Sequence, residues 1–168
     1  VDPSKLGFAG YSMGGMITSM TAIDKRLKAV APFVGGTANL QENYPGMNSG
    51  GLVRVKDTEL YKNTMDPGAY WKHVTIPVMF ITSSNDFHST LDRIYQSMDL
   101  LSHGNWRVTG NMHANHSPGP EQWVMLNQWF KQYLAGVEQN IPATPPSTFN
   151  IEKNTAHFTV TPAQQERL

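Results

Sequence analysis

Residues 5–17 read Lys5-Leu6-Gly7-Phe8-Ala9-Gly10-Tyr11-Ser12-Met13-Gly14-Gly15-Met16-Ile17, and this stretch decides the fold. Its apolar first half is typical of a β-strand that ends at Gly10. Beyond Gly15 the apolar residues recur at helical spacing. The stretch therefore predicts a strand, a tight turn and a helix, with Ser12 at the apex of the turn.

The Gly-x-Ser-x-Gly pattern explains how such a turn exposes a hydroxyl group. Small residues at Gly10 and Gly14 are expected because the strand and the helix approach each other there, and a Cβ atom would collide. Ser12 would then lie near the positive end of the helix, and the backbone N–H of Met13 would face a developing oxyanion. The alternative is a glycine-rich turn whose serine only caps the helix.

The rest of the chain predicts further strands and helices in alternation. Buried strands are expected at 27–34 and 76–82, and a last short strand at 105–109. Helices are expected at 57–63, 91–101 and 121–136, the last with its apolar face formed by Trp123, Leu126, Phe130 and Leu134. Short crossovers favour parallel pairing. The pattern predicts a three-layer α/β fold, with mainly parallel strands flanked by helices.

A polar, glycine-rich segment follows the strand at 27–34 and extends to residue 56. Long excursions from the carboxyl ends of parallel strands lie over the ligand site in open α/β sheets. Aromatic residues in and after this segment are candidates for a pocket wall or lid, although each could equally pack the segment down. The candidate pocket residues are Tyr11, Tyr44, Tyr61, Tyr70, Trp71 and the rim residue His88.

Asp86 comes just after the buried strand at 76–82. A carboxylate at the end of a central parallel strand is well placed to orient a catalytic histidine. We therefore select Asp86 as the acid of a nucleophile, acid and base set. The alternative is that Asp86 caps the next helix or stabilises a turn, with Asp92 inside that helix as the second candidate acid.

Two histidines compete for the role of base in the loop that follows the strand at 105–109. His116 is preferred because it adjoins the rigid Pro-Gly-Pro exit of the loop, whereas His113 could hydrogen-bond within the loop. A metal site built from these two histidines and His88 is disfavoured, since no third ligand is fixed by spacing. No metal and no cofactor is expected.

Composition excludes several other classes of function. Lys plus Arg and Asp plus Glu both number 13, so a zero formal charge disfavours a nucleic-acid partner. The absence of cysteine excludes disulfides and thiolate catalysis. No apolar run approaches the roughly eighteen residues that a membrane span needs, so no membrane partner is expected.

Length suggests an incomplete domain. The sequence has 168 residues and begins one turn before the first strand, whereas domains of this class usually run to roughly 200–250 residues or more. We expect residues 1–141 to form part of a catalytic domain. Residues 142–168 read as a Pro-rich linker and the beginning of a β-rich segment, with strands near 147–153 and 156–161.

The turn at Ser12, the acid turn at 82–88 and the histidine loop at 111–116 together resemble the C-terminal half of an α/β-hydrolase domain. The resemblance covers about residues 1–141, and within the superfamily it is nearest to the acetyl xylan esterase, dienelactone hydrolase and prolyl oligopeptidase-like group. The order Ser12, Asp86, His116 is the chain order of this superfamily.

The resemblance implies a serine hydrolase that cleaves carboxylic esters, such as acetyl esters of carbohydrates, through a Ser-His-Asp triad. The alternatives are a prolyl oligopeptidase-like peptidase and a non-catalytic binding domain of the same fold. It also implies that the earlier strands and the second oxyanion donor come from a preceding segment or a second chain. A secreted or periplasmic location is favoured by the resemblance alone.

Overall fold

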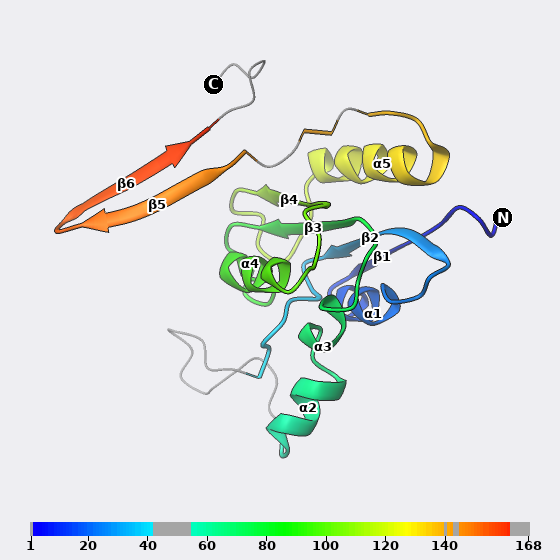
Figure 1. Ribbon diagram of the computed structural model, residues 1–168, viewed down its shortest axis with the longest axis horizontal. Helices are drawn as coiled ribbons and strands as arrows, with labels where there is room; N and C mark the ends of the chain where they lie inside the picture. The colour runs from blue at the N-terminus through cyan, green and yellow to red at the C-terminus, as the bar shows by residue number, and fades with distance from the viewer. Residues whose placement is uncertain (1, 42–54, 140, 143–144, 162–168) are drawn as a thin grey trace.

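The computed structural model describes residues 2–41, 55–139, 141–142 and 145–161. A four-stranded sheet lies between two layers of helices, and a two-stranded hairpin extends away from this body (Figure 1). The three-layer α/β arrangement predicted from the sequence is therefore confirmed.

All four strands of the main sheet are parallel. They are β1 (Leu6–Tyr11), β2 (Leu27–Phe33), β3 (Val78–Ser83) and β4 (Trp106–Asn111), and they lie in the order β1-β2-β3-β4. Neighbours in the chain are thus neighbours in the sheet. Because the strands are parallel, the turns after β1, β3 and β4 all leave the same edge of the sheet.

Helices cover both faces of this sheet (Figure 1). One face carries α1 (Met13–Thr21), α3 (Gly68–Trp71) and α4 (Leu91–Asp99), with α2 (Thr58–Thr64) packed beside α3. The other face carries α5 (Pro120–Ala135). Within the described part of the chain, no helix has the length and apolarity to cross a bilayer.

Alternating side chains of the central strands divide the core into two clusters. Phe80 packs with Trp71 and Ile94 on the α1, α3 and α4 side. Its neighbours Met79 and Ile81 pack with Trp129 of α5 on the other side. All six residues of β3 are buried, because a parallel strand with helices on both faces has no exposed side.

The buried face of α5 differs from the prediction. Trp123 is 53% exposed, whereas Gln122 and Trp129 are fully buried. The predicted face is therefore wrong at Trp123, and the buried stripe includes a polar residue. Gln122 is buried because its amide bonds backbone groups of the sheet, a role that a search for apolar spacing does not detect. The end of the helix is as expected, with Gly136 in the left-handed conformation.

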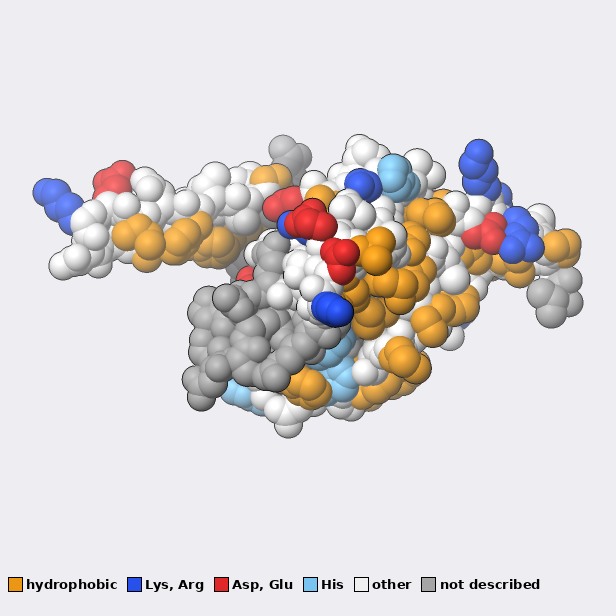
Figure 2. Space-filling model, turned by 90° about the horizontal axis from the view of Figure 1, so that it is seen from below, with side chains coloured by type: hydrophobic (Ala, Val, Ile, Leu, Met, Phe, Trp, Pro, Cys, Tyr) orange, Lys and Arg blue, Asp and Glu red, His pale blue; other side chains and the backbone are white. Residues whose placement is uncertain are grey.

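The final two strands form an antiparallel hairpin, β5 (Ser147–Glu152) and β6 (Thr155–Val160), as the alternating pattern predicts. Phe149 pairs with Phe158, and the next pair along the same face is Ile151 with Ala156. The phenylalanines and Ile151 are more than 60% exposed. Figure 2 shows apolar side chains along one side of the arm that this hairpin forms.

Candidate active site

The turn between β1 and α1 places a serine in an unusual backbone conformation. Ser12 has φ 56° and ψ −112° and directly precedes α1. Its N–H donates to the Phe33 carbonyl at 2.8 Å, and its own carbonyl accepts from Gly15 N–H at 2.8 Å. The backbone is thus fixed on both sides of the side chain, which lies at the amino end of the helix.

Glycines are required in this turn and in the segment after β2 that packs against it, but not all at the positions that the pattern suggests. A Cβ atom on Gly10 would lie 2.1 Å from the Gly14 carbonyl oxygen, and one on Gly35 would lie 2.1 Å from the Ser12 carbonyl oxygen. A Cβ atom on Gly15 would also be too close to its surroundings, at 2.8 Å from the carbonyl carbon of Gly35. A Cβ on Gly14 meets nothing within 4 Å, so the prediction that Gly14 must be small is wrong here.

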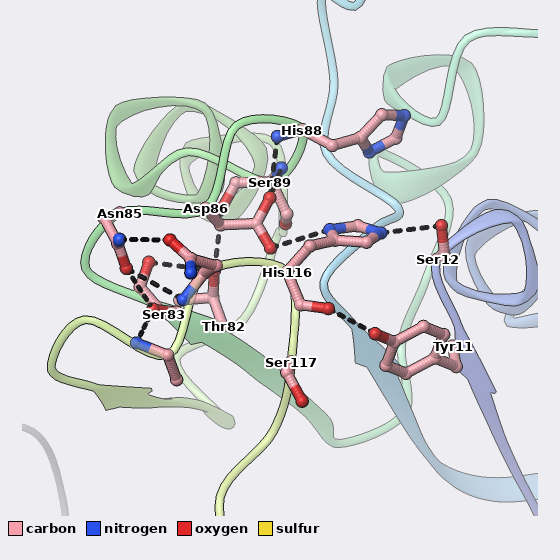
Figure 3. Close-up of polar contacts among 12 residues, drawn as sticks. Tyr11, Ser12, Thr82, Ser83, Asn85, Asp86, His88, Ser89, His116 and Ser117 are labelled. Atoms are coloured by element: carbon pink, nitrogen blue, oxygen red, sulfur yellow. Dashed lines mark hydrogen bonds and ion pairs between the residues drawn. The ribbon is translucent and has the colours of Figure 1, made fainter.

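Three side chains from three separate turns meet at the carboxyl edge of the sheet (Figure 3). His116 Nε2 lies 2.8 Å from Ser12 Oγ, and His116 Nδ1 lies 2.9 Å from Asp86 Oδ2. The Asp86 side chain is fully buried and that of His116 is 19% exposed. An ionised carboxylate only accepts, so Nδ1 carries the proton and Nε2 is left to accept from the serine hydroxyl.

The other oxygen of Asp86 is held by the backbone of its own turn. Asp86 Oδ1 accepts from the N–H groups of His88 at 2.7 Å and Ser89 at 2.6 Å. Asp86 does not cap α4, since the residue before that helix is Thr90. The second candidate acid, Asp92, lies in the first turn of α4 and is exposed. The carboxylate in contact with the histidine is therefore that of Asp86.

Of the two histidines in the loop after β4, the structure brings His116 to the serine. The His113 side chain is exposed, and its backbone N–H donates to Ser84 Oγ at 3.1 Å. His113, the alternative base, is thus not in contact with Ser12. Among the described residues, no group of three or more metal-ligating side chains is arranged to hold an ion.

Aromatic rings surround the imidazole of His116. Tyr11, Phe87 and His88 lie with ring centroids 5.6, 4.8 and 5.8 Å from it, and the Tyr11 hydroxyl donates to the His116 carbonyl. Burial, and secondly the neighbouring His116, lower the pKa of His88 below its usual 6.5. Phe87 was not among the predicted pocket residues, although its position directly after Asp86 indicated that it could lie beside the histidine. Tyr11 and His88 therefore border the site.

Two of the remaining pocket candidates, Trp71 and Tyr70, have contacts elsewhere. Trp71 is fully buried in the core and donates to the Gly36 carbonyl at 2.6 Å, so its prediction as a pocket wall is wrong. Tyr70 donates to the Thr64 carbonyl at 2.6 Å, within the α2–α3 segment. Burial, and secondly the charge of Asp66, raise the pKa of Tyr61 to about 12. Tyr44 lies outside the described residues.

One backbone donor at the start of α1 lies beside Ser12. Met13 is the first residue of the helix, so its N–H has no carbonyl acceptor within the helix. The Met13 N–H follows directly on Ser12, where the helix dipole favours negative charge. A tetrahedral oxyanion formed on Ser12 could accept from it.

Comparisons with known proteins give structural neighbours. No family model and no curated protein sequence matches the chain significantly. Solved structures do match: an acylaminoacyl peptidase from Pyrococcus horikoshii has a TM-score of 0.67 at 17% identity, covering 85% of this chain and 26% of that one. An acetyl xylan esterase from Paenibacillus sp. R4 has a TM-score of 0.64 at 17% identity, covering 80% of this chain and 47% of that one.

A third neighbour is a Klebsiella pneumoniae protein described as a dienelactone hydrolase, with a TM-score of 0.57 at 20% identity over 79% of this chain and 54% of that one. The chain thus spans about a quarter of the peptidase and about half of the other two proteins. These neighbours share one fold, which is the fold that the motifs of the chain resemble.

Proposed function

The chain has the α/β-hydrolase fold, and on that premise we propose that it is the nucleophile-bearing part of a serine hydrolase that cleaves carboxylic esters. The observation that carries the proposal is the pair of contacts made by one imidazole, 2.8 Å to Ser12 Oγ and 2.9 Å to Asp86 Oδ2. In this proposal Ser12 is the nucleophile, His116 the general base and Asp86 the residue that fixes the tautomer.

The reaction follows from these roles. Ser12 Oγ forms a bond to the ester carbonyl carbon while His116 Nε2 takes the hydroxyl proton, and Asp86 stabilises the resulting imidazolium. The carbonyl electron pair moves to the oxygen, which accepts from the Met13 N–H. When the carbonyl re-forms, the alcohol departs with the proton from His116. Water, activated by the same imidazole, then attacks the acyl-enzyme and releases the acid.

Acetyl esters of carbohydrates are the substrate class that we favour. The support is the likeness to an acetyl xylan esterase, together with the ester-cleaving group that the sequence motifs resemble. The rim formed by Tyr11, Phe87 and His88 offers aromatic surface and one imidazole beside the nucleophile. Aromatic faces pack readily against apolar faces of ligands.

A peptidase is the second candidate, because acylaminoacyl peptidase structures are among the neighbours. The two candidates differ in the leaving group, an alcohol or an amine. Hydrolysis rates of a small acetyl ester and of a prolyl amide on the full-length protein would separate them. Faster turnover of the amide would favour the peptidase.

We expect the second oxyanion donor to come from a segment outside this chain. Loss of one such donor typically lowers turnover by roughly 100- to 1,000-fold. The 168-residue chain alone should therefore be a slow catalyst, and activity should be measured on the complete protein.

A fluorophosphonate probe tests the proposed nucleophile directly. In the full-length protein we expect covalent labelling at Ser12, measured by mass spectrometry of the labelled peptide, and its loss in Ser12→Ala. Ser117→Ala is the matched control, since this exposed serine lies next to His116 without bonding to the triad. Labelling that persists in Ser12→Ala would exclude Ser12, and a folded protein that is never labelled would favour the non-catalytic alternative.

A further inference from the structure

The loop that carries His116 has a backbone that needs support. His113 and Asn115 both have φ 54°, in the left-handed region that residues other than glycine seldom adopt. Asparagine is among the side chains that tolerate this conformation best. Since His116 directly follows Asn115 in the chain, contacts that fix the backbone of Asn115 also fix the backbone position of His116, the proposed base.

The support comes from the acid turn that precedes Asp86. Three consecutive N–H groups of the histidine loop donate to three consecutive side chains of that turn. The bonds are His113 N–H to Ser84 Oγ at 3.1 Å, Ala114 N–H to Ser83 Oγ at 3.0 Å and Asn115 N–H to Asn85 Oδ1 at 2.9 Å. The acid turn therefore shapes the histidine loop as well as supplying the carboxylate.

Asn85 makes the most extensive of these contacts. Besides accepting from Asn115 N–H, it donates from Nδ2 to Asn115 Oδ1 at 2.5 Å, and its Oδ1 also accepts from Ser83 Oγ at 2.9 Å (Figure 3). The orientation of the amide is fixed, because a backbone N–H can only donate and so must face the oxygen of Asn85. The nitrogen of Asn85 is then left for Asn115.

We propose that Asn85 is a positioning residue, which sets the place of His116 through its paired contacts with Asn115. The proposal rests on the proposed function, since it assigns a role relative to the base of that reaction. Asn85 directly precedes Asp86, and Asn115 directly precedes His116. The contact between the two asparagines therefore joins the acid turn to the histidine loop one residue before the two side chains that must meet. On the other side, the Tyr11 hydroxyl bonds the His116 carbonyl.

Two charge-matched variants test whether the paired contact matters rather than the identity of the amides. Asn115→Asp keeps an acceptor for Asn85 Nδ2, so the pair should survive. Asn85→Asp keeps the acceptor for Asn115 N–H, and the Asn115 amide can turn so that its Nδ2 donates to the second carboxylate oxygen, so the pair should survive here too. Both variants add one negative charge at nearly the same place, and both residues are exposed, so neither change buries a charge.

Two measurements on the full-length protein read out the result. The first is the second-order rate constant for fluorophosphonate labelling of Ser12. We expect a fall of about 10- to 100-fold for Asn85→Ala, since a misplacement of about 1 Å at a catalytic group costs about that much. Asn115→Asp and Asn85→Asp should stay within about threefold of wild type. Asn63→Ala, which removes an amide contact in α2, is the control and should not change the rate.

The second measurement does not depend on activity. In ¹⁵N-histidine-labelled protein, the His116 Nδ1 proton bonded to Asp86 should resonate far downfield, remain in Asn115→Asp and Asn85→Asp, and disappear or broaden in Asn85→Ala. If wild type is not labelled but this signal responds as stated, the proposed function fails and the positioning role stands. If neither labelling nor the signal is seen in wild type, both fail.

Non-additivity provides the final check. Asn85→Ala and Asn115→Ala both remove the contact between the two side-chain amides, so the combined loss of labelling rate in the double variant should be smaller than the product of the two single losses. Additive losses, or a change below about twofold for Asn85→Ala with the Nδ1 proton retained, would overturn the proposal. An unchanged melting temperature in all variants would show that the loss is one of position and not of folding.

Discussion

The carboxylate of Asp86 divides its two oxygens between two tasks. Oδ1 accepts from the N–H groups of His88 and Ser89, and Oδ2 contacts His116 Nδ1. Because the backbone donors cannot turn away, the side chain has a single orientation. The residue can therefore fix the tautomer of the histidine without a further partner.

This division makes Asp86→Asn an informative substitution. The amide oxygen must face the two backbone N–H groups, which leaves Nδ2 facing His116 Nδ1. The imidazole then carries its proton on Nε2, where it can no longer accept from Ser12. We expect the labelling rate of Ser12 to fall by about 10⁴-fold, as for loss of the orienting acid in a serine triad, with little change in melting temperature. Asp92→Asn is the control and should leave the rate unchanged.

The glycines around Ser12 differ in how well they should tolerate an added methyl group. Gly35→Ala forces a Cβ to 2.1 Å from the Ser12 carbonyl oxygen, so the turn or the end of β2 must shift. We expect a loss of about 2 kcal/mol or more in unfolding free energy, and slower labelling of Ser12. Gly14→Ala places its Cβ in open space at the start of α1 and should be neutral or stabilising by up to about 1 kcal/mol. Chemical denaturation measures the unfolding free energy of both variants. Equal values for Gly35→Ala and Gly14→Ala would show that the close approach of Gly35 to the Ser12 carbonyl is unimportant.

Local sequence predicted which residues meet, because Ser12, Asp86 and His116 each follow a strand and parallel strands deliver such residues to one edge. Their catalytic roles stay predictions. The sequence could not predict that residue 35 must be glycine, because this requirement arises from its close approach to Ser12, which lies 23 positions earlier in the chain. Nor could it show that Trp71 is buried, since an aromatic residue after a loop can face either core or ligand.

Among the elements, α5 is joined to the sheet by a buried amide. Gln122 Nε2 donates to the carbonyls of Thr82 at 2.7 Å and Thr109 at 2.9 Å, and its Oε1 accepts from Gly119 N–H at 2.8 Å. One side chain thus links the carboxyl ends of β3 and β4 to the beginning of the helix. Apolar periodicity predicted the extent of α5 but not this buried face, because a glutamine does not contribute to a pattern of apolar residues.

Replacing this amide should be costly. Gln122→Leu keeps a similar volume but leaves two strand carbonyls without their donor in a buried site. We expect the unfolding free energy to fall by about 2–4 kcal/mol, measured by urea denaturation. Gln128→Leu, on the same helix and partly exposed, is the control and should change it by less than about 0.5 kcal/mol. Equal effects would show that the carbonyls find other partners.

Across the whole molecule, the hairpin of β5 and β6 is distinct from the α/β body. Its residues are exposed almost throughout, and its two faces differ sharply. One face pairs Phe149 with Phe158, while the other pairs Thr148 with Thr159. We propose that the domain boundary lies near residue 142, as the proline-rich composition indicates.

Truncation tests this boundary. A chain that ends at Pro142 retains the contact of Arg107 Nε with the Pro142 carbonyl at 2.6 Å and the packing of Ile141 on the core. We expect its melting temperature to match that of the 168-residue chain, because the removed hairpin contributes little buried surface. A drop of several degrees would contradict the boundary. Scanning calorimetry provides the measurement.

The hydrogen bonds between the two loops limit how segments of this fold can be exchanged with those of a related protein. A foreign histidine loop grafted between β4 and α5 would lack the side chains that its backbone N–H groups bonded in its own protein, because Ser83, Ser84 and Asn85 would stay in place. Chimeras should therefore succeed when the acid turn and the histidine loop are transferred together.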